Sequence, residues 1–263
     1  MSPTPLYTIE SCRAAHQLNW SLTLFWRREP PNEQEWLEPL RTATEVDDVR
    51  IVEHRFTNRG NSQFLISTKP TVSPSATIRS IKGRLQHRVR TILPKAFQRN
   101  YSIQSVGSGN TTAIENYVAK QTGHHRMADA AVQKRLERYQ IVDTAIDLSQ
   151  MRRSSYGLFL HNLHLVMVHR DRDVEVCEES LQRSIDTMRK ICRKKGRLLS
   201  RAGLVADHMH LTLGCGVNEA PGDVALNTMN NLTFAHGMKG LFEDSYYVGT
   251  FGPYDLNAIR RGL

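Results

Sequence analysis

An alternation of polar and apolar residues at 204–213, Leu-Val-Ala-Asp-His-Met-His-Leu-Thr-Leu, predicts a β-strand. The glycine-rich segment Gly214-Cys215-Gly216 that follows is typical of a strand end. Side chains two residues apart on a strand point to the same face of the sheet. We therefore expect His208 and His210 to project together and Met209 to point to the opposite face.

Similar patterns predict the other elements. We expect strands at 19–26, 50–56, 63–67, 101–106, 158–168 and 246–250, and a strand pair over 198–213. We expect helices at 33–46, 76–92, 112–121, 178–195, 224–239 and 256–261. The polar stretch 128–155 is expected to be helical in part and to connect two halves of the chain.

Two helix starts have recognisable capping residues. Ser73 precedes Pro74, which predicts a helix with Ser73 as N-cap and Pro74 as first residue. Thr112-x-x-Glu115 predicts a capping box for a helix that runs to about Gln121, and Gly123 is expected to end that helix.

The order of predicted elements occurs twice, and so does part of the sequence. Residues 101–107, Tyr-x-Ile-x-Ser-Val-Gly, match 246–252, Tyr-x-Val-x-Thr-Phe-Gly, without a gap. Residues 61–66 fall on 208–213 with a two-residue difference in spacing. Each copy, β-α-β-β-α-β-α, predicts an α+β fold of the ferredoxin-like (split βαβ, RRM-like) type with an antiparallel sheet. We expect a first half at 1–127, a connection at 128–155 and a second half at 156–263.

The composition of the chain indicates what kind of partner it binds. The chain has 263 residues, 40% hydrophobic residues and a net charge of +9, which favours a polyanionic partner, nucleic acid first, over a merely basic protein. The cysteines are widely spaced with no C-x-x-C, which is typical of reduced thiols in a cytoplasmic protein. Neither a signal peptide nor an apolar run of about 18–20 residues is found, so we expect no membrane partner.

Two residue pairs carry candidate chemistry. His208 and His210 form half of a possible divalent-metal site, and the alternative is the solvated face of an amphipathic strand. Tyr117 and Gln121 lie four apart, so on one helix they share a face. A tyrosine can act as a covalent nucleophile, and a glutamine oxygen can bind a hard cation. The alternative is an amphipathic helix with a half-buried tyrosine.

Together, the two motifs resemble a known family. Asp207-His208-Met209-His210-Leu211, and Glu115-Asn116-Tyr117-Val118-Ala119-Lys120-Gln121 with the following His124-His125, resemble the insertion-sequence single-tyrosine HUH transposases. That family includes the TnpA-like enzymes and the REP-associated tyrosine transposases. The resemblance extends over 61–125 and from about 158 onward.

The departures from the family pattern are complementary. The first half has Asn61-Ser62-Gln63 where the family has its histidine pair. The second half has Gly262 at the tyrosine position, and the sequence reaches Leu263 before any glutamine. The family builds its composite sites between two subunits. The resemblance therefore implies a single-chain pseudo-dimer with one composite site.

In that site the resemblance implies that His208, His210 and Gln121 bind Mg²⁺ or Mn²⁺. Tyr117 would attack single-stranded DNA, with a hairpin expected in the substrate, and form a 5′-phosphotyrosine. Asp207 is expected either to orient an imidazole or to close a turn. Lys120 is expected to contact phosphate or to remain solvated.

Other basic residues receive weaker roles. His124 and His125 are expected at a helix end or on DNA rather than on the metal, and His161, His164 and His169 are expected to be structural. The basic helix is expected to contact the DNA backbone, with a solvated face as the alternative. Its candidate DNA-binding residues are Arg79, Lys82, Arg84 and Arg88.

Three functions remain open from the sequence. The first is a transposase-like nuclease and strand transferase in a prokaryotic, nucleoid-associated setting. The second is a domesticated protein that binds a DNA or RNA hairpin without transesterification. The third is an HUH nickase without a role in transposition. The active unit is expected to be a monomer that acts as a pseudo-dimer, or a dimer of such chains.

Overall fold

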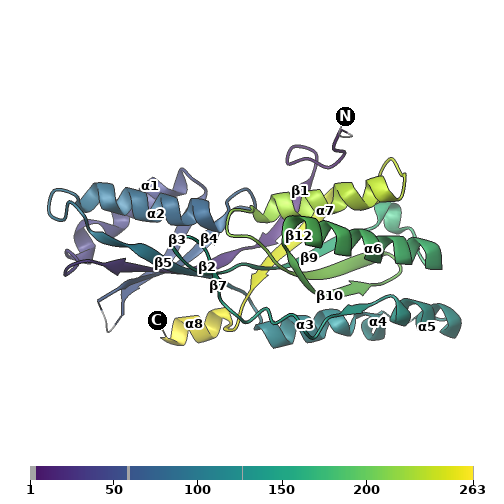
Figure 1. Cartoon of the computed structure of the whole chain (residues 1–263). Helices are drawn as coiled ribbons and strands as arrows, with labels where there is room; N and C mark the ends of the chain where they lie inside the picture. Colours follow the sequence, from purple (N-terminus) through teal and green to yellow (C-terminus); the bar gives the residue numbers. More distant parts are fainter. Residues whose placement is uncertain (1–3, 58–59, 126, 263) are drawn as a thin grey trace.

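The computed structural model describes residues 4–57, 60–125 and 127–262. The fold is α+β, with two six-stranded sheets side by side (Figure 1). We call the sheet with the order β3-β4-β2-β5-β8-β7 the first sheet, and the sheet with the order β1-β12-β9-β11-β10-β6 the second sheet. Within the described ranges, no helix is long and apolar enough to cross a membrane.

The elements have the following bounds. The first sheet contains β2 (Asn19–Trp26), β3 (Val49–Phe56), β4 (Ser62–Thr68), β5 (Phe97–Val106), β7 (Arg152–Arg153) and β8 (Gly157–Leu160). The second sheet contains β1 (Arg13–Gln17), β6 (Ile141–Val142), β9 (Asn162–Val168), β10 (Leu198–Leu204), β11 (His208–Gly214) and β12 (Ser245–Phe251). The α-helices are α1 (Leu37–Glu45), α2 (Pro74–Val89), α3 (Thr111–Ala119), α4 (Gln121–His124), α5 (Ala130–Arg138), α6 (Glu178–Lys195), α7 (Pro221–Ala235) and α8 (Leu256–Gly262).

The two sheets repeat one strand order. The order β3-β4-β2-β5 corresponds to β10-β11-β9-β12, and all neighbours in these two sets are antiparallel. The register even shifts at the same place, between Ile51 and Glu53 on β3 and between Leu199 and Arg201 on β10. Positions on the two sheets can therefore be matched one to one, and we call matched positions equivalent.

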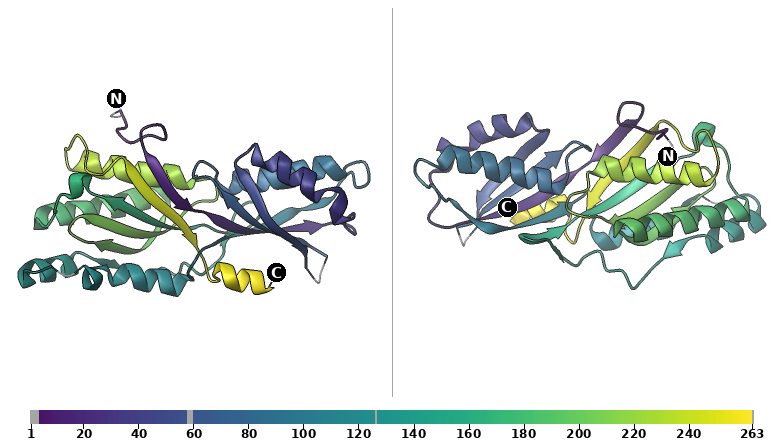
Figure 2. Two further views of the ribbon diagram at one scale, coloured as in Figure 1. Left: turned by 180° about the vertical axis from the view of Figure 1, so that it is seen from behind. Right: turned by 45° about the horizontal axis from the view of Figure 1, so that its top comes forward.

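Helices lie in two layers. Figures 1 and 2 show α1 and α2 over one face of the first sheet and α6 and α7 over the same side of the second sheet. Apolar side chains from these helices and the sheets form two cores, one around Trp20, Trp36 and Phe64 and one around Met209 and Phe242. The other faces of the sheets carry α3 to α5 and α8, as both views show.

The two sheets are joined where β5 and β12 cross. The Ser105 hydroxyl donates to the carbonyl of Phe251 at 2.6 Å, and the Thr250 hydroxyl donates to the carbonyl of Val106 at 2.6 Å. Ser105 and Thr250 match each other in the gapless alignment of 101–107 with 246–252. The crossing is therefore locally symmetric.

Glycine is required at this crossing. A Cβ atom at Gly107 would lie 2.0 Å from the Thr250 carbonyl oxygen, and one at Gly252 would lie 2.2 Å from the Ser105 carbonyl oxygen. The carbonyl of Gly252 accepts from the Thr111 backbone N–H at 2.7 Å, and the carbonyl of Gly107 accepts from the Leu256 N–H at 2.9 Å. Each strand end thus holds the first residue of the helix that follows the other strand.

Elements are exchanged between the sheets as a result. The helix after β5, α3, packs on β10 and β11 of the second sheet. The helix after β12, α8, packs through Ile259 on Leu65 and Val106 of the first sheet. Two strands cross as well, because β1 precedes β2 but pairs with β12, whereas β8 precedes β9 but pairs with β5.

Several sequence predictions are confirmed. The strand at 19–26 and the helix at 178–195 have the predicted bounds. The Ser73 side chain accepts from the Ala76 N–H with Pro74 in the first turn, as expected. The strand predicted at 158–168 is instead two strands in different sheets, β8 and β9, which separate at His161. An apolar run does not show that a strand leaves one sheet for another.

The predicted cap of the tyrosine helix was wrong. Asn110 is the N-cap of α3, since its side chain accepts from the Ala113 N–H at 2.9 Å, whereas Thr112 already lies inside the helix. The helix also breaks at Lys120, and Gly123 lies within α4 rather than at a helix end. Asparagine is among the best N-caps, and the Gly252 carbonyl fixes the preceding turn, so the earlier start prevails.

Candidate active site

His208 and His210 lie on the face of the second sheet that α3 and α4 cover. Their ring centroids are 5.0 Å apart, and both side chains are buried. Met209 points to the opposite face and belongs to the hydrophobic core. The alternation at 204–213 therefore predicted the side-chain directions, although β11 begins only at His208.

Tyr117 from α3 reaches this pair. Its ring centroid lies 5.6 Å from that of His210 and 6.0 Å from that of His164, edge-on to both. Tyr117 is nevertheless 45% exposed. The tyrosine is thus held against the imidazoles while remaining accessible to a large substrate.

Gln121 is buried beneath the tyrosine helix. Its Nε2 donates to the Tyr117 carbonyl at 3.2 Å, and its Oε1 has no hydrogen-bond partner among the described residues. A Cβ atom at Gly203 would lie 2.7 Å from the Val118 carbonyl oxygen and 3.1 Å from Gln121 Cγ. Gly203 pairs with His210 across the strands, so this glycine lets Gln121 come close to the histidine.

Each imidazole is fixed through Nδ1. Asp207 Oδ1 accepts from His208 Nδ1 at 2.7 Å, and Arg172 holds the other Asp207 oxygen at 2.9 Å. Burial acts to raise the pKa of Asp207, but the hydrogen bonds from His208 and Arg172 outweigh it and lower that pKa. His210 Nδ1 lies 3.0 Å from His164 Nε2, so one donates to the other. The Nε2 atoms of both His208 and His210 thereby remain for a ligand.

Burial keeps His210 and His164 neutral. Burial, together with the neighbouring His164, His208 and His125 as potential positive charges, lowers the pKa of His210 to about 2. Burial also lowers the pKa of His164 to about 4. Neutral imidazoles are the form in which histidine binds a metal.

His164, which was expected to be structural, lies in the site. Its ring stacks on His210 with centroids 5.2 Å apart and lies 5.8 Å from Tyr247. His164 pairs with Thr212, diagonal to His210, so only the register of β9 with β11 reveals the contact. His125, which was expected at a helix end or on DNA, lies 4.8 Å from His208 between ring centroids.

The donor set suits a divalent cation. Across the described ranges, no three His, Cys, Asp or Glu side chains are grouped so that they could hold a metal ion. The expected set needs two imidazoles and the Gln121 oxygen, and that oxygen is buried without a partner. Mn²⁺ accepts imidazole together with oxygen ligands, whereas Mg²⁺ prefers oxygen alone. These three residues therefore fit a cation of this class.

The basic helix α2 lies on the other side of the sheets from α3, the helix that carries Tyr117 (Figure 1). Arg84 forms a two-bond ion pair with Asp47 at 2.8 Å, and the Lys82 ammonium donates to backbone carbonyls of β5, the nearest at 2.6 Å. Arg79 and Arg88 are exposed. Of the four arginines and lysines expected on DNA, Lys82 and Arg84 thus already have structural partners.

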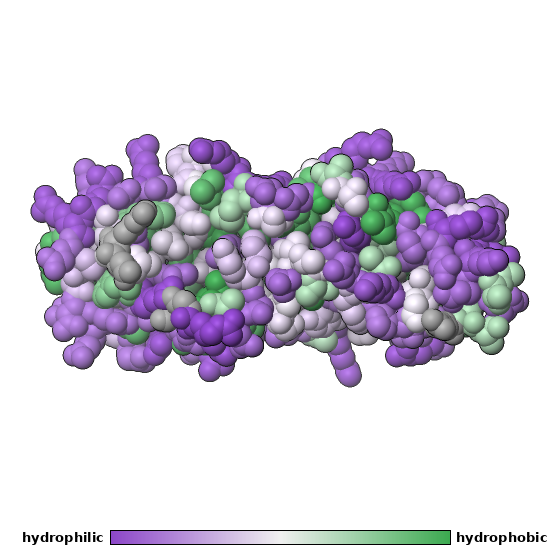
Figure 3. All heavy atoms as spheres, turned by 90° about the horizontal axis from the view of Figure 1, so that it is seen from below, coloured by the Kyte–Doolittle hydropathy of each residue, from purple (hydrophilic) through white to green (hydrophobic). Residues whose placement is uncertain are grey.

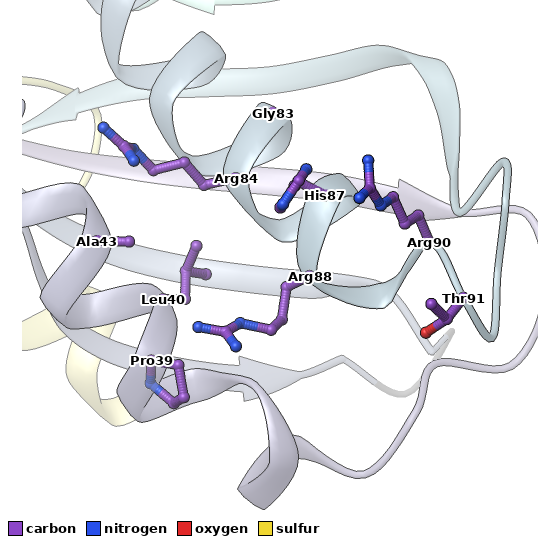
Figure 4. Close-up of a pocket in the computed structure, with 9 residues that line it drawn as sticks. All are labelled: Pro39, Leu40, Ala43, Gly83, Arg84, His87, Arg88, Arg90 and Thr91. Carbon is purple, nitrogen blue, oxygen red and sulfur yellow. The ribbon is translucent and has the colours of Figure 1, made fainter.

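A pocket of about 520 Å³ lies between α1 and α2. Figure 4 shows Arg88 reaching from α2 toward Pro39 on α1, with His87 on the same helix and Arg90 directly after its end. Seen from the opposite side, the face with α3 to α5 and α8 is mostly hydrophilic with a paler band near its middle (Figure 3). The exposed cations of α2 and the tyrosine helix α3 therefore lie on different faces.

Comparisons with known proteins are sparse. No protein-family model and no curated protein matches the sequence. Among solved structures, a REP-associated tyrosine transposase bound to a REP hairpin is similar with a TM-score of 0.32 and 13% identity, over 39% of this chain and 61% of the transposase. An unknown protein from Galdieria sulphuraria is similar with a TM-score of 0.21 and 8% identity, over 89% of this chain and 97% of that protein. Similarities this low carry no argument about function.

Proposed function

We propose that the chain is a metal-dependent, single-stranded DNA endonuclease and strand transferase of the single-tyrosine HUH transposase type. In this proposal it is a single-chain pseudo-dimer of two ferredoxin-like halves, 1–127 and 156–263, connected by 128–155. The equivalent strand order of the two sheets and the reciprocal contacts at the crossing support a duplicated origin.

One observation carries the proposal. Tyr117 follows a strand of the first sheet, yet its ring lies 5.6 Å from His210 on the second sheet. The equivalent position on α8 is Gly262, and the equivalent of His210 on the first sheet is Gln63. Among the residues that the structure describes, a tyrosine and the histidine pair therefore meet in one place.

The chemistry follows from these groups. Tyr117 Oη would form a bond to the phosphorus of a DNA phosphodiester, and the 3′ oxygen would leave and take up a proton. The product is a 5′-phosphotyrosine with a free 3′-OH, and attack by another 3′-OH would reverse the step. A Mg²⁺ or Mn²⁺ ion held by His208, His210 and Gln121 would polarise the scissile phosphate. Asp207 orients His208, and Lys120, exposed three residues after the tyrosine, is a candidate phosphate contact.

The test is covalent trapping. Hairpin-containing single-stranded DNA is incubated with the protein and Mn²⁺ or Mg²⁺, and a denaturation-resistant adduct is sought. We expect an adduct that Tyr117→Phe abolishes and Tyr156→Phe, at another exposed tyrosine, preserves. An adduct that survives in Tyr117→Phe would contradict the assigned nucleophile.

A hairpin-binding protein without transesterification is the second candidate. The first sheet favours it, because Gln63 and Ser21 stand where a second site would have His210 and His164. Tight hairpin binding with no adduct under any metal would establish this function. Adduct formation without strand exchange would instead identify an HUH nickase, and exchange that rises with protein concentration would indicate a dimer of such chains.

A further inference from the structure

Each exchanged helix forms an ion pair with the sheet on which it lies. Arg201 of β10 lies 3.8 Å from Glu115 of α3, measured from Nη2 to Oε2. Glu53 of β3 lies 2.9 Å from Arg260 of α8, measured from Oε1 to Nε. The first pair has its cation on the sheet, and the second has its cation on the helix.

These pairs occupy equivalent positions. Arg201 pairs with Thr212, and Glu53 pairs with Leu65, just after the same register shift. The helices match through their N-caps, since Asn110 caps α3 and the Asp255 side chain accepts from the Ala258 N–H at the start of α8. Counting from those caps, Glu115 and Arg260 are the same position. At these equivalent positions the two charges are therefore exchanged between sheet and helix.

We infer that this inverted pair of contacts directs each helix to the sheet of the other half, so that the tyrosine helix has a single docking place. If α3 lay on the first sheet instead, Glu115 would meet Glu53. If α8 lay on the second sheet, Arg260 would meet Arg201. Both misplaced helices would bring like charges together, whereas both observed helices bring opposite charges together.

The ion pair between α3 and β10 is largely buried, which strengthens the interaction between its charges. The side chains of Arg201 and Glu115 are only 14% and 15% exposed, so water and salt screen them less than a surface pair. Glu115 Oε1 is buried and has no hydrogen-bond partner among the described residues. With Arg201 replaced by an acidic residue, that carboxylate would lose its nearby cation.

The space available on each sheet also favours the observed position of α3. The backbone of α3 and Gln121 come so close to Gly203 that a Cβ atom there would lie 2.7 Å from the Val118 carbonyl oxygen. The equivalent residue on the first sheet is Arg55, whose guanidinium donates to Gln63 Oε1 at 2.7 and 3.1 Å. The first sheet thus lacks the space that α3 uses on the second sheet.

The inference rests on the proposed function only in treating Tyr117 as the group to be delivered. Its test measures where α3 lies and needs neither DNA nor metal. Spin labels are placed at exposed Asn116 on α3 and at exposed Lys194 on α6, with a second pair at Asn116 and Arg90 near the first sheet. The background carries Cys12→Ser and Cys177→Ser, because the other two cysteines are buried.

The variants form a double-mutant cycle. We expect Glu115→Arg to broaden the Asn116–Lys194 distance distribution and to speed amide exchange across α3 by about tenfold, as like charges meet. Arg201→Glu added to it should restore both readouts. Thr112→Arg places an arginine on the same helix at an exposed position and should change neither. Glu115→Gln, which removes the attraction without repulsion, serves if the reversal unfolds the chain, and should speed exchange by about threefold.

Exchange in Glu115→Arg no faster than in Thr112→Arg would overturn the inference, as would a double variant that is no better docked than either single variant. A shift of the Asn116–Arg90 distance to a shorter population in Glu115→Arg/Arg260→Glu/Arg55→Gly would support it directly. If docking behaves as expected but no DNA adduct forms, the proposed function fails while the inference stands.

Discussion

Gln63 on the first sheet and His210 on the second occupy equivalent positions, but their polar atoms are used differently. Gln63 Nε2 donates to Ser21 at 3.0 Å, and Gln63 Oε1 accepts from Arg55 at 2.7 Å. Among the described residues, His210 forms a side-chain hydrogen bond through Nδ1 alone, with His164, the equivalent of Ser21. The same scaffold therefore holds a closed hydrogen-bond network on one sheet and a set with free ligand atoms on the other.

The two sheets share a strand order, so the strand order does not decide which of them can bind a metal ion. What differs is which polar atoms are left without a hydrogen-bond partner. A glycine on the second sheet makes room for Gln121, and an arginine on the first sheet fills the equivalent space. Placing first-sheet residues at the equivalent positions of the second sheet should therefore disrupt helix docking and metal binding separately.

The largest effect is expected from Gly203→Arg, which introduces the first-sheet residue. The new side chain must displace Val118 and Gln121, so α3 and α4 should detach and unfolding should become easier by about 3 kcal/mol. Urea denaturation and amide exchange over α3 provide the measurement, with Gly83→Ala, which meets no neighbour within 4 Å, as control. Unchanged protection of α3 in Gly203→Arg would refute the tight approach.

His161→Leu introduces the residue found at the equivalent position, Leu18. Burial lowers the pKa of His161 from 6.5 to about 4. Above pH 6.5 the side chain is neutral in both the folded and unfolded states and has no pH-dependent effect. Below that pH the unfolded chain takes up the proton first, so stability falls until about pH 4, by up to about 3 kcal/mol.

We expect the leucine variant to lose part of this acid sensitivity. Thermal denaturation of both proteins from pH 7 to pH 4 measures it, and at pH 7 the two should differ least. Parallel curves for the two proteins would show that His161 is not the group that titrates.

His210→Gln places the first-sheet residue in the candidate metal site. Loss of one imidazole ligand should weaken Mn²⁺ binding by about 100-fold or more. Calorimetry or electron paramagnetic resonance with Mn²⁺ alone measures the affinity. The reverse change, Gln63→His, should create no second site, because Arg55 fills the space beside it.

His164→Ser tests the residue that the sequence analysis left out. Serine stands at the equivalent position, and the shorter side chain should release His210 Nδ1. We expect Mn²⁺ affinity to fall about tenfold, as for other residues that orient a metal ligand. His164→Asn, which keeps a polar group nearer His210, should lose less, and an affinity equal to wild type in both variants would exclude an orienting role.

The smallest effect is expected from Arg88→Ala. Counted from Pro74 and Pro221, which begin α2 and α7, Arg88 matches Ala235. Arg88 is exposed, and its helix α2 lies on the other side of the sheets from α3. Affinity for single-stranded DNA should fall about threefold, and the slope of affinity against salt should decrease by about one ion. Affinity measured at several salt concentrations checks this, and an unchanged salt slope would mean that α2 does not lie on the DNA backbone.

The sequence by itself determined the local structure of both sheets. The alternation around His208 and His210 placed both imidazoles on one face because the side-chain period of a strand is fixed. Ser73 before Pro74 placed the start of α2, because a serine side chain can accept a hydrogen bond from a free N–H group of the first helical turn. Local signals failed at α3, where Asn110 rather than Thr112 is the cap, because a distant carbonyl holds the first turn.

Only the tertiary structure decided what meets what. His164 joined the site through the register of β9 with β11, and His161 marks the point where one apolar run passes between two sheets. The contact of Tyr117 with His210 depends on the crossing of β5 and β12. There Gly107 and Gly252 let the two backbones come so close that no Cβ atom would fit between them. Such contacts join residues far apart in the chain, and no local periodicity encodes them. The sequence supplied the groups, and the exchange of helices between the sheets brought the tyrosine to the histidines.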